Sequence, residues 1–145
     1  NNLPSFIFKS KNEIEKTRRP IYKDGIHFYN YYTLPTPKEY ISPVILDILC
    51  PKERKPKLNN GHLEPAITIS LGPNDIYARF AEKLNKTTWV KFKVNNDKKT
   101  NWVVGSSYFE PSFCRHTYSR ATDGLGRILS YTTRSNLENL MKFMD

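Results

Sequence analysis

The residues of this chain best suited to chemistry are aromatic and basic side chains that alternate along one short stretch. Residues 89–94 read Trp-Val-Lys-Phe-Lys-Val, so in a strand Trp89, Lys91 and Lys93 share one face. The apolar residues between them take the opposite face, which we expect to pack in the core. A tryptophan and two lysines on a solvent face suit a partner that carries negative charge and flat rings.

Three further segments extend this candidate surface. They are the Lys- and Asn-rich loop that follows residue 94, the Pro-bounded basic loop 51–57, and the stretch 108–120, where arginines alternate with aromatic residues. Such side chains can neutralise phosphates and stack on bases. We therefore expect nucleic-acid contacts from Lys98, Lys99, Trp102, Tyr108, Arg115, Arg120, Lys52, Arg54, Lys55 and Lys57, in addition to the three strand residues. The alternative is that the tryptophans are partly buried and the lysines are simply solvated.

Catalytic and metal-binding patterns find little support. His27, His62 and His116 show neither HxH nor HExxH spacing, and Cys50 and Cys114 stand far apart. Such a set is not typical of a zinc site. The sequence therefore predicts a protein that is not an enzyme and that has no catalytic residue, no metal and no cofactor.

Two weaker catalytic patterns stay open. Asp47 with Glu53 resembles the carboxylate arrangement of metal-dependent nucleases, although both lie around one loop. Arg115, His116, Tyr118 and Arg120 are residue types used by enzymes that cleave strands with a tyrosine nucleophile, but their close packing in sequence fits no such pattern.

Length and charge set the outer bounds. With 145 residues, 38% of them hydrophobic, the chain suits a single domain over 1–145, excised from a longer chain, with the first ~20 residues as an extension. Its formal net charge of +9 favours nucleic acid, acidic lipid headgroups or an acidic protein segment as partner. No apolar run is long enough to span a membrane. Two isolated cysteines predict free thiols in a reducing compartment, nuclear or cytoplasmic.

The candidate surface needs strands to position it. Alternation and aromatic content predict strands over 26–33, 44–50 and 66–71, and extended segments over 89–94, 102–104, 113–119 and 126–133. Turn residues separate them, including Asp123-Gly124-Leu125-Gly126.

Three helices are predicted. A capping box at Ser10–Glu13 starts a short helix over 11–18, and Asn74 or Asp75 caps an interior helix that carries apolar residues from Ile76 to Leu84. A second capping box, Ser135–Glu138, opens a C-terminal amphipathic helix. Its apolar stripe is expected to dock on the sheet and comprises Leu137, Leu140, Met141 and Met144.

These elements predict an α+β fold: a mostly antiparallel, strongly bent or barrel-like sheet, with one interior helix and a C-terminal amphipathic helix. The closing strand and capped helix over 126–145 resemble the end of a pleckstrin-homology-like barrel, which implies a binding module, and an OB-like barrel is equally compatible. The leading hypothesis is a non-enzymatic module that binds DNA or RNA. The alternative is a protein-interaction domain, possibly pleckstrin-homology-like, that binds a partner peptide or an acidic lipid headgroup.

Overall fold

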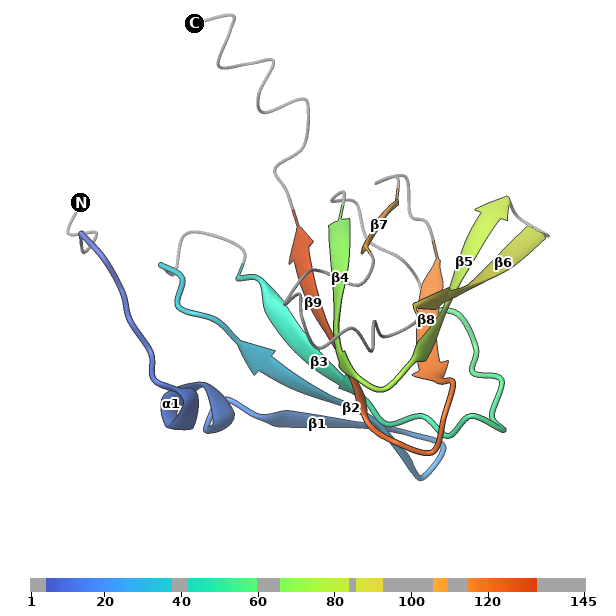
Figure 1. Ribbon diagram of the computed structural model, residues 1–145, viewed down its shortest axis with the longest axis horizontal. Helices are drawn as coiled ribbons and strands as arrows, with labels where there is room; N and C mark the ends of the chain where they lie inside the picture. Colours follow the sequence, from blue (N-terminus) through green and yellow to red (C-terminus); the bar gives the residue numbers. More distant parts are fainter. Residues whose placement is uncertain are drawn as a thin grey trace, which may run out of the picture.

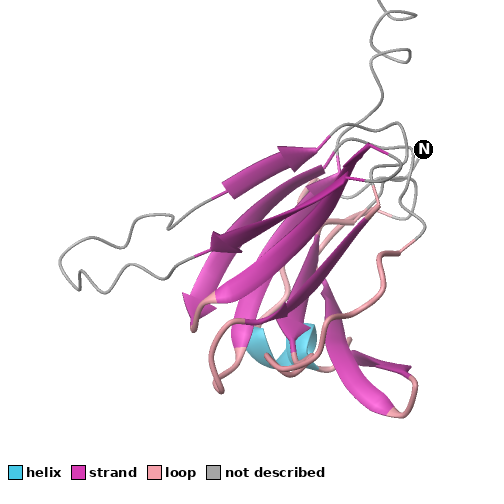
Figure 2. Ribbon diagram, turned by 90° about the vertical axis from the view of Figure 1, so that its right-hand side faces the viewer, coloured by secondary structure: helices cyan, strands magenta, loops and turns pink. Residues whose placement is uncertain are grey.

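Two antiparallel β-sheets face each other and account for nearly all of the regular structure (Figures 1 and 2). The computed structural model describes residues 5–37, 42–59, 66–83, 86–92, 106–109 and 115–132. One sheet has six strands in the order β1-β2-β3-β9-β4-β7, and the other has three in the order β6-β5-β8. The fold is a β-sandwich in which the chain changes sheet four times: from β4 to β5, from β6 to β7, from β7 to β8 and from β8 to β9.

The strand bounds follow the alternation in the sequence. The six-stranded sheet comprises β1 (Arg19–Lys23), β2 (Ile26–Thr33), β3 (Val44–Ile48), β9 (Gly126–Thr132), β4 (Ala66–Pro73) and β7 (Ser106–Phe109). The three-stranded sheet comprises β6 (Lys86–Phe92), β5 (Ile76–Lys83) and β8 (His116–Arg120). The strands expected near 26–33, 44–50, 66–71, 89–94, 113–119 and 126–133 are confirmed within the described residues. Residues 93–94, 113–114 and 133 of these predictions lie outside the described part of the chain.

The core lies between the two sheets. Ile48 and Ile128 come from the first sheet and Ile76 from the second, and all three are fully buried. The other core side chains are Phe28, Tyr29, Leu46, Cys50, Ala78, Phe92 and Tyr118. Because both sheets contribute one face to this core, their opposite faces are available to loops, to the helix or to solvent.

A short helix, α1 (Lys11–Glu15), precedes the first strand. The predicted capping box is present: the Ser10 hydroxyl accepts from the backbone N–H of Glu13, and the Glu13 carboxylate accepts from the N–H of Ser10. The helix stays short, and Pro20 falls in the edge strand β1, where its missing N–H costs no ladder bond.

The predicted α+β barrel is wrong. The sheets do not close into a barrel, and α1 is the one helix among the described residues. Asn74 and Asp75 lie in the turn before β5, and the segment expected as the interior helix is that strand. Ile76 and Phe80 are four residues apart, which suits a helical face, but they also sit at even steps of a strand, with Ala78 between them on the buried side.

Two predicted elements lie outside the described residues. They are the strand at 102–104 with the loop that precedes it, and the C-terminal helix with its stripe.

Candidate active site

A cavity of about 350 Å³ opens between the two sheets. The six-stranded sheet supplies most of its wall, and β8 together with the connection before β4 supplies the rest. Its lining residues are Arg19, Ile21, Lys23, Tyr29, Tyr31, Val44, Leu46, Asn59, His116, Thr117, Tyr118, Ile128 and Ser130.

The register of the sheet explains why these side chains meet. Tyr31 pairs with Arg19 on one side and with Leu46 on the other, and Leu46 pairs in turn with Ile128. Directly opposite residues share a face, so this row of four side chains crosses β1, β2, β3 and β9 on the side that faces the cavity. A slip of one residue in any pair would turn these side chains outward.

The cavity carries positive charge. Among its described lining residues Arg19 and Lys23 are cationic and none is acidic. The Arg19 guanidinium lies 6.0 Å from the ring centre of Tyr31, and the Lys23 ammonium lies 5.6 Å from that of Tyr29. Aromatic rings thus hold both cations at the cavity wall without neutralising them, which favours an anionic ligand.

His116 is the best candidate for a metal ligand in this cavity. It is buried, with 7% of its surface exposed, and its Nε2 lies 3.0 Å from the side-chain amide nitrogen of Asn59. The orientation of that amide is fixed because its oxygen accepts from the backbone N–H of His116 at 2.9 Å. An amide nitrogen can only donate, so Nε2 is the acceptor in this contact. A neutral imidazole with a lone pair on Nε2 is the form that binds a metal ion.

Two tyrosines in the cavity are held in their protonated form. Burial raises the pKa of Tyr29, whose hydroxyl contacts Oγ1 of Thr117 at 3.2 Å and accepts from the backbone N–H of Tyr118 at 3.2 Å. Burial also raises the pKa of Tyr31, and the charge of Arg19 opposes this shift. Both phenols therefore remain hydrogen-bond donors at neutral pH.

The predicted surface around Trp89 is only partly assembled. Trp89 and Lys91 lie on the face of β6 away from the core, as predicted, and Phe92 is buried on the other. Trp89 is half-buried, packs edge-on against Tyr77 at 6.0 Å and lies 5.5 Å beneath the guanidinium of Arg79. Lys91 pairs with Asp75 at 3.5 Å. Val90, expected in the core, is 38% exposed.

The basic loop does approach Trp89. A shallow second hollow of about 310 Å³ is lined by Lys52, Glu53, Arg54, Lys55, Tyr77, Trp89 and Ser119. Lys52 also pairs with Asp123 at 3.1 Å. Lys57 is exposed on the same loop but does not line this hollow.

The remaining predicted residues do not line this hollow or lie outside the described residues. Arg115 is exposed and donates to the carbonyl of Asn59, and Arg120 donates to the carbonyls of Leu49 and Asp123. The backbone of Tyr108 is in β7. Lys93, Lys98, Lys99 and Trp102 lie outside the described residues.

Comparison with known proteins identifies the kind of domain. The model of the 2-hydroxyethylphosphonate dioxygenase cupin-like domain matches residues 15–133. The chain belongs to this family. It is 53% identical over 135 residues to 2-hydroxyethylphosphonate dioxygenase of Streptomyces viridochromogenes (strain DSM 40736 / JCM 4977 / BCRC 1201 / Tue 494), covering 93% of this chain and 30% of that protein.

Solved structures agree with the cupin-like assignment. A structure described as Phpd with cadmium complexed with hydroethylphosphonate superposes with a TM-score of 0.78 at 49% identity, covering 94% of this chain and 32% of that one. Fe(II)-HppE in complex with substrate superposes with a TM-score of 0.72 at 17% identity, covering 92% of this chain and 64% of that one, which supports the fold alone. The chain spans about a third of the length of its more similar relatives.

These findings overturn the functional predictions made from charge. A cupin-like domain of an enzyme family is neither a nucleic-acid-binding module nor a protein-interaction module, so those two hypotheses and the non-enzymatic assignment are wrong. Relatives bind a small molecule and a metal, whereas nucleic acid was the predicted partner. A nuclear location has no support from a Streptomyces relative. The described residues contain no helix that is long and apolar enough to cross a membrane.

The cavity was not predicted as a metal site, because the histidines of the sequence show neither HxH nor HExxH spacing. The sequence does contain candidate ligands for a metal ion. Glu110 lies six residues before His116, and His62 follows Asn59 by three residues. Two histidines and one carboxylate are the ligands of many non-haem iron oxygenases. His62 and Glu110 lie outside the described residues.

Proposed function

We propose that this chain is the cupin-like domain of a metal-dependent dioxygenase and that its cavity binds a small phosphonate of the 2-hydroxyethylphosphonate type. The observation that carries the proposal is a buried imidazole, His116, in a cavity whose described charged residues, Arg19 and Lys23, are positive. The relative at 53% identity is named for this reaction, and the proposal extends that function to this chain.

The described part of the cavity offers one side chain, His116, that suits a divalent metal ion. His116 offers the Nε2 lone pair toward the amide of Asn59, which would release it when a metal binds. We propose His62 and Glu110 as the other protein ligands, because His62 follows the His116-bonded Asn59 by three residues and Glu110 directly follows β7. Among the described residues there is no group of three metal-binding side chains, so the proposed set depends on these two sequence positions. When bound, Fe(II) in such a set would supply the O₂ chemistry of the reaction.

The other cavity residues would bind and orient the phosphonate. Its charged oxygens would accept hydrogen bonds from Arg19 or Lys23, and charge-assisted bonds of this kind are about twice as strong as neutral ones. The Tyr31 hydroxyl and the Ser130 hydroxyl are further donors on the same wall. The apolar side chains of Leu46 and Ile128 would exclude water beneath the ligand. A bacterial cytoplasmic location fits such an enzyme and is part of the proposal.

Metal binding tests the first half of the proposal. Purified protein is titrated with Cd²⁺ by calorimetry, and one ion per chain is expected. His116→Ala should weaken Cd²⁺ binding by at least about 10-fold. The matched control is His27→Ala, since His27 contacts Asn30 and does not line the cavity. If His116→Ala binds Cd²⁺ as tightly as the parent, the proposed metal site is wrong.

The carboxylate assignment needs its own pair of variants. Glu110→Gln should weaken Cd²⁺ binding, whereas Glu64→Gln, two residues after His62, should leave the affinity unchanged. The reverse result would move the carboxylate ligand to Glu64.

Ligand binding tests the second half. In the presence of Cd²⁺, 2-hydroxyethylphosphonate should raise the melting temperature of the parent by several degrees, since a ligand that binds only the folded state stabilises it. Lys23→Ala should remove most of that shift. Lys11→Ala is the control, because the Lys11 side chain is 88% exposed on α1. An equal shift in Lys23→Ala and the control would contradict phosphonate binding at this wall.

A further inference from the structure

The six-stranded sheet has a second apolar face, directed away from the core. Along β4 the small or hydroxyl-bearing residues Ala66, Thr68 and Ser70 are buried toward the interior, while the larger Ile67, Ile69 and Leu71 point outward. In a strand with only one covered face, the large apolar residues normally point toward the interior and the small or polar residues toward solvent. The outward isoleucines and leucine are therefore typical of a sheet that is covered on both sides.

Neighbouring strands continue this surface. Ile67 pairs directly with Tyr131 of β9, and Ile69 pairs with Leu129. Ile67, Leu71 and Tyr131 are 37%, 49% and 47% exposed, respectively. We call Ile67, Ile69, Leu71, Leu129 and Tyr131 the outer apolar patch. Contiguous exposed patches of this kind usually mark a contact surface.

Part of the same face is already covered by the beginning of the chain. Thr17, just after α1, accepts from the backbone N–H of Thr33 at 2.9 Å, and Arg18 donates to the Asn30 side chain at 3.3 Å. The tertiary contacts of α1 are with β2. The outer apolar patch lies on β4 and β9, beyond the strand that α1 contacts.

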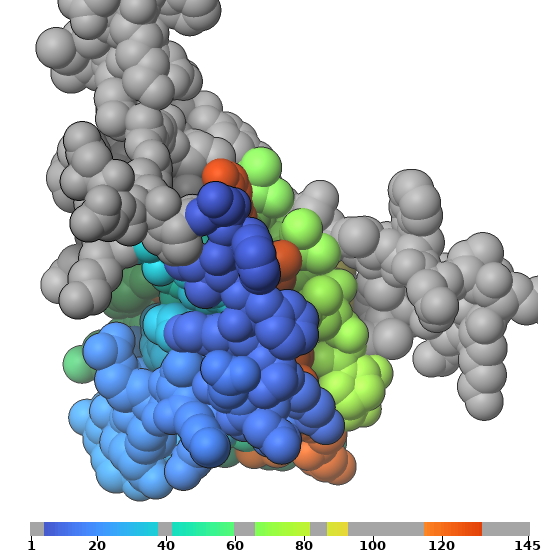
Figure 3. All heavy atoms as spheres, turned by 90° about the vertical axis from the view of Figure 1, so that its left-hand side faces the viewer, coloured from blue at the N-terminus to red at the C-terminus, as the bar shows by residue number. Residues whose placement is uncertain are grey.

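The segment before α1 borders this surface. In Figure 3 its dark-blue atoms run over this side of the molecule, flanked by the green of β4 and the orange-red of β9. Phe6 and Phe8 are 82% and 76% exposed.

The chain itself contains a segment that fits. Thr132, the last residue of β9, adjoins Tyr131 of the patch, and the predicted C-terminal helix begins within five residues of it. A ten-residue helix over 136–145 would be about 15 Å long, and the four residue steps from Ile67 to Leu71 span about 13 Å. An isolated helix of this length is marginal in water, so its stripe needs a surface to be stable.

We propose that the outer apolar patch is the docking surface of this chain's own C-terminal helix, 136–145. The stripe of Leu137, Leu140, Met141 and Met144 would lie along β4 and β9, in the groove-binding manner of amphipathic helices. Asn136, Asn139 and Lys142 would face solvent. This docking closes the uncovered part of the six-stranded sheet and is independent of the function of the cavity.

Photo-crosslinking tests the contact directly. Benzoylphenylalanine replaces Tyr131 in the full chain, and the irradiated protein is digested and analysed by mass spectrometry. The expected product joins position 131 to a peptide from 136–145, with a yield that does not depend on protein concentration. Cross-links between two chains, or none to this segment, would overturn the proposal.

A double-mutant cycle tests the energetics. Leu140→Ala should lower the melting temperature by about 5 °C, and Asn139→Ala, on the polar side, by less than about 1 °C. In a Tyr131→Ser background the Leu140→Ala effect should fall to half or less, because the two side chains share one contact. Fully additive effects would overturn the docking site even where both variants are destabilised.

Discussion

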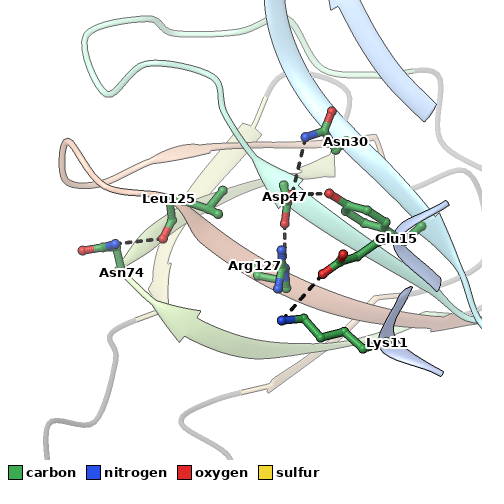
Figure 4. Close-up of polar contacts among 8 residues, drawn as sticks. Lys11, Glu15, Asn30, Asp47, Asn74, Leu125 and Arg127 are labelled. Atoms are coloured by element: carbon green, nitrogen blue, oxygen red, sulfur yellow. Dashed lines mark hydrogen bonds and ion pairs between the residues drawn. The ribbon is translucent and has the colours of Figure 1, made fainter. Parts of the chain in front are cut away.

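Asp47 accepts a hydrogen bond from Nε of Arg127 across the β3–β9 pair at 2.6 Å, with its side chain only 5% exposed. The second carboxylate oxygen accepts from the Tyr32 hydroxyl at 2.9 Å and from the Asn30 amide at 3.4 Å (Figure 4). The hydrogen bond that Arg127 donates to Asp47 raises the pKa of Arg127. This network ties three neighbouring strands together on the face opposite the cavity, one residue away from Tyr31, Leu46 and Ile128.

Asp47→Asn should lower the free energy of unfolding by about 2 kcal/mol, because a buried charged partner is lost while the Arg127 side chain, 42% exposed, can still be solvated. Urea denaturation followed by circular dichroism measures the change. Asp123→Asn is the matched control, since the Asp123 side chain is 86% exposed in its pair with Lys52 and should cost less than about 0.5 kcal/mol. Equal losses in the two variants would contradict a special role for the Asp47 network.

Gly126→Ala should destabilise the protein by about 3 kcal/mol, through steric overlap. A Cβ at this position would collide with Cγ2 of Ile76 and would lie 2.9 Å from the backbone oxygen of Asn74. Gly25→Ala is the comparison variant, because it introduces backbone strain without steric overlap. Gly25 has φ +75°, and no atom lies within 4 Å of a Cβ added there. We expect about 1 kcal/mol there. Melting temperatures in the same buffer should rank the two variants in this order.

Strand positions were largely predictable because alternation is a local property. The run from Ile26 to Thr33 gave β2 with its observed bounds. The alternation pattern was misleading at β5, because a spacing of four residues suits both one face of a helix and one face of a strand. Ile76 and Phe80 have this spacing. The pairing of β5 with β6 and β8 makes the segment a strand. β1 was missed because Pro20 looked like a stop signal, whereas an edge strand tolerates it.

The candidate site was not predictable from local patterns. His116 and Asn59 are 57 residues apart in sequence, and Arg19 reaches the same cavity from an edge strand. Period-two alternation assigns residues to opposite faces but does not show which face meets another sheet. Net charge was misleading for the same reason: a basic chain can use two of its cations in a small-molecule cavity and leave the others at the surface.

Tyr29→Phe should lower the free energy of unfolding by about 1.5 kcal/mol, since the hydroxyl lies among buried partners on β8. The ring remains, so hydrophobic packing between the sheets is kept. Tyr22→Phe is the control, because Tyr22 is 62% exposed and contacts His27 by ring stacking. Urea denaturation of both variants gives the comparison, and a loss in Tyr22→Phe as large as in Tyr29→Phe would show that the hydroxyl contacts add no stability.

The last prediction concerns alkaline pH. Cys50 is a free, fully buried thiol, consistent with the prediction that the cysteines are unpaired, although Cys114 lies outside the described residues. Burial raises the pKa of Cys50 from 9.0 to about 11. Between these values the unfolded chain loses the thiol proton while the folded chain keeps it, so the unfolded state binds fewer protons and stability falls as pH rises. This loss begins near pH 9 and ends near pH 11, where the folded thiol also ionises.

A background of Cys114→Ser isolates Cys50 for this measurement. In that background the free energy of unfolding should decline more steeply from pH 8 to pH 10.5 than in a Cys50→Ala, Cys114→Ser double variant, which lacks the titrating thiol. Burial also raises the pKa of Tyr29 and Tyr31, and both variants share that contribution. Native Cys50 should also react with Ellman's reagent far more slowly at pH 8 than the urea-unfolded chain does, because the thiolate is the reactive form. Parallel pH profiles in the two variants, or rapid reaction of the native thiol, would show that Cys50 is accessible to water and that its pKa is not raised.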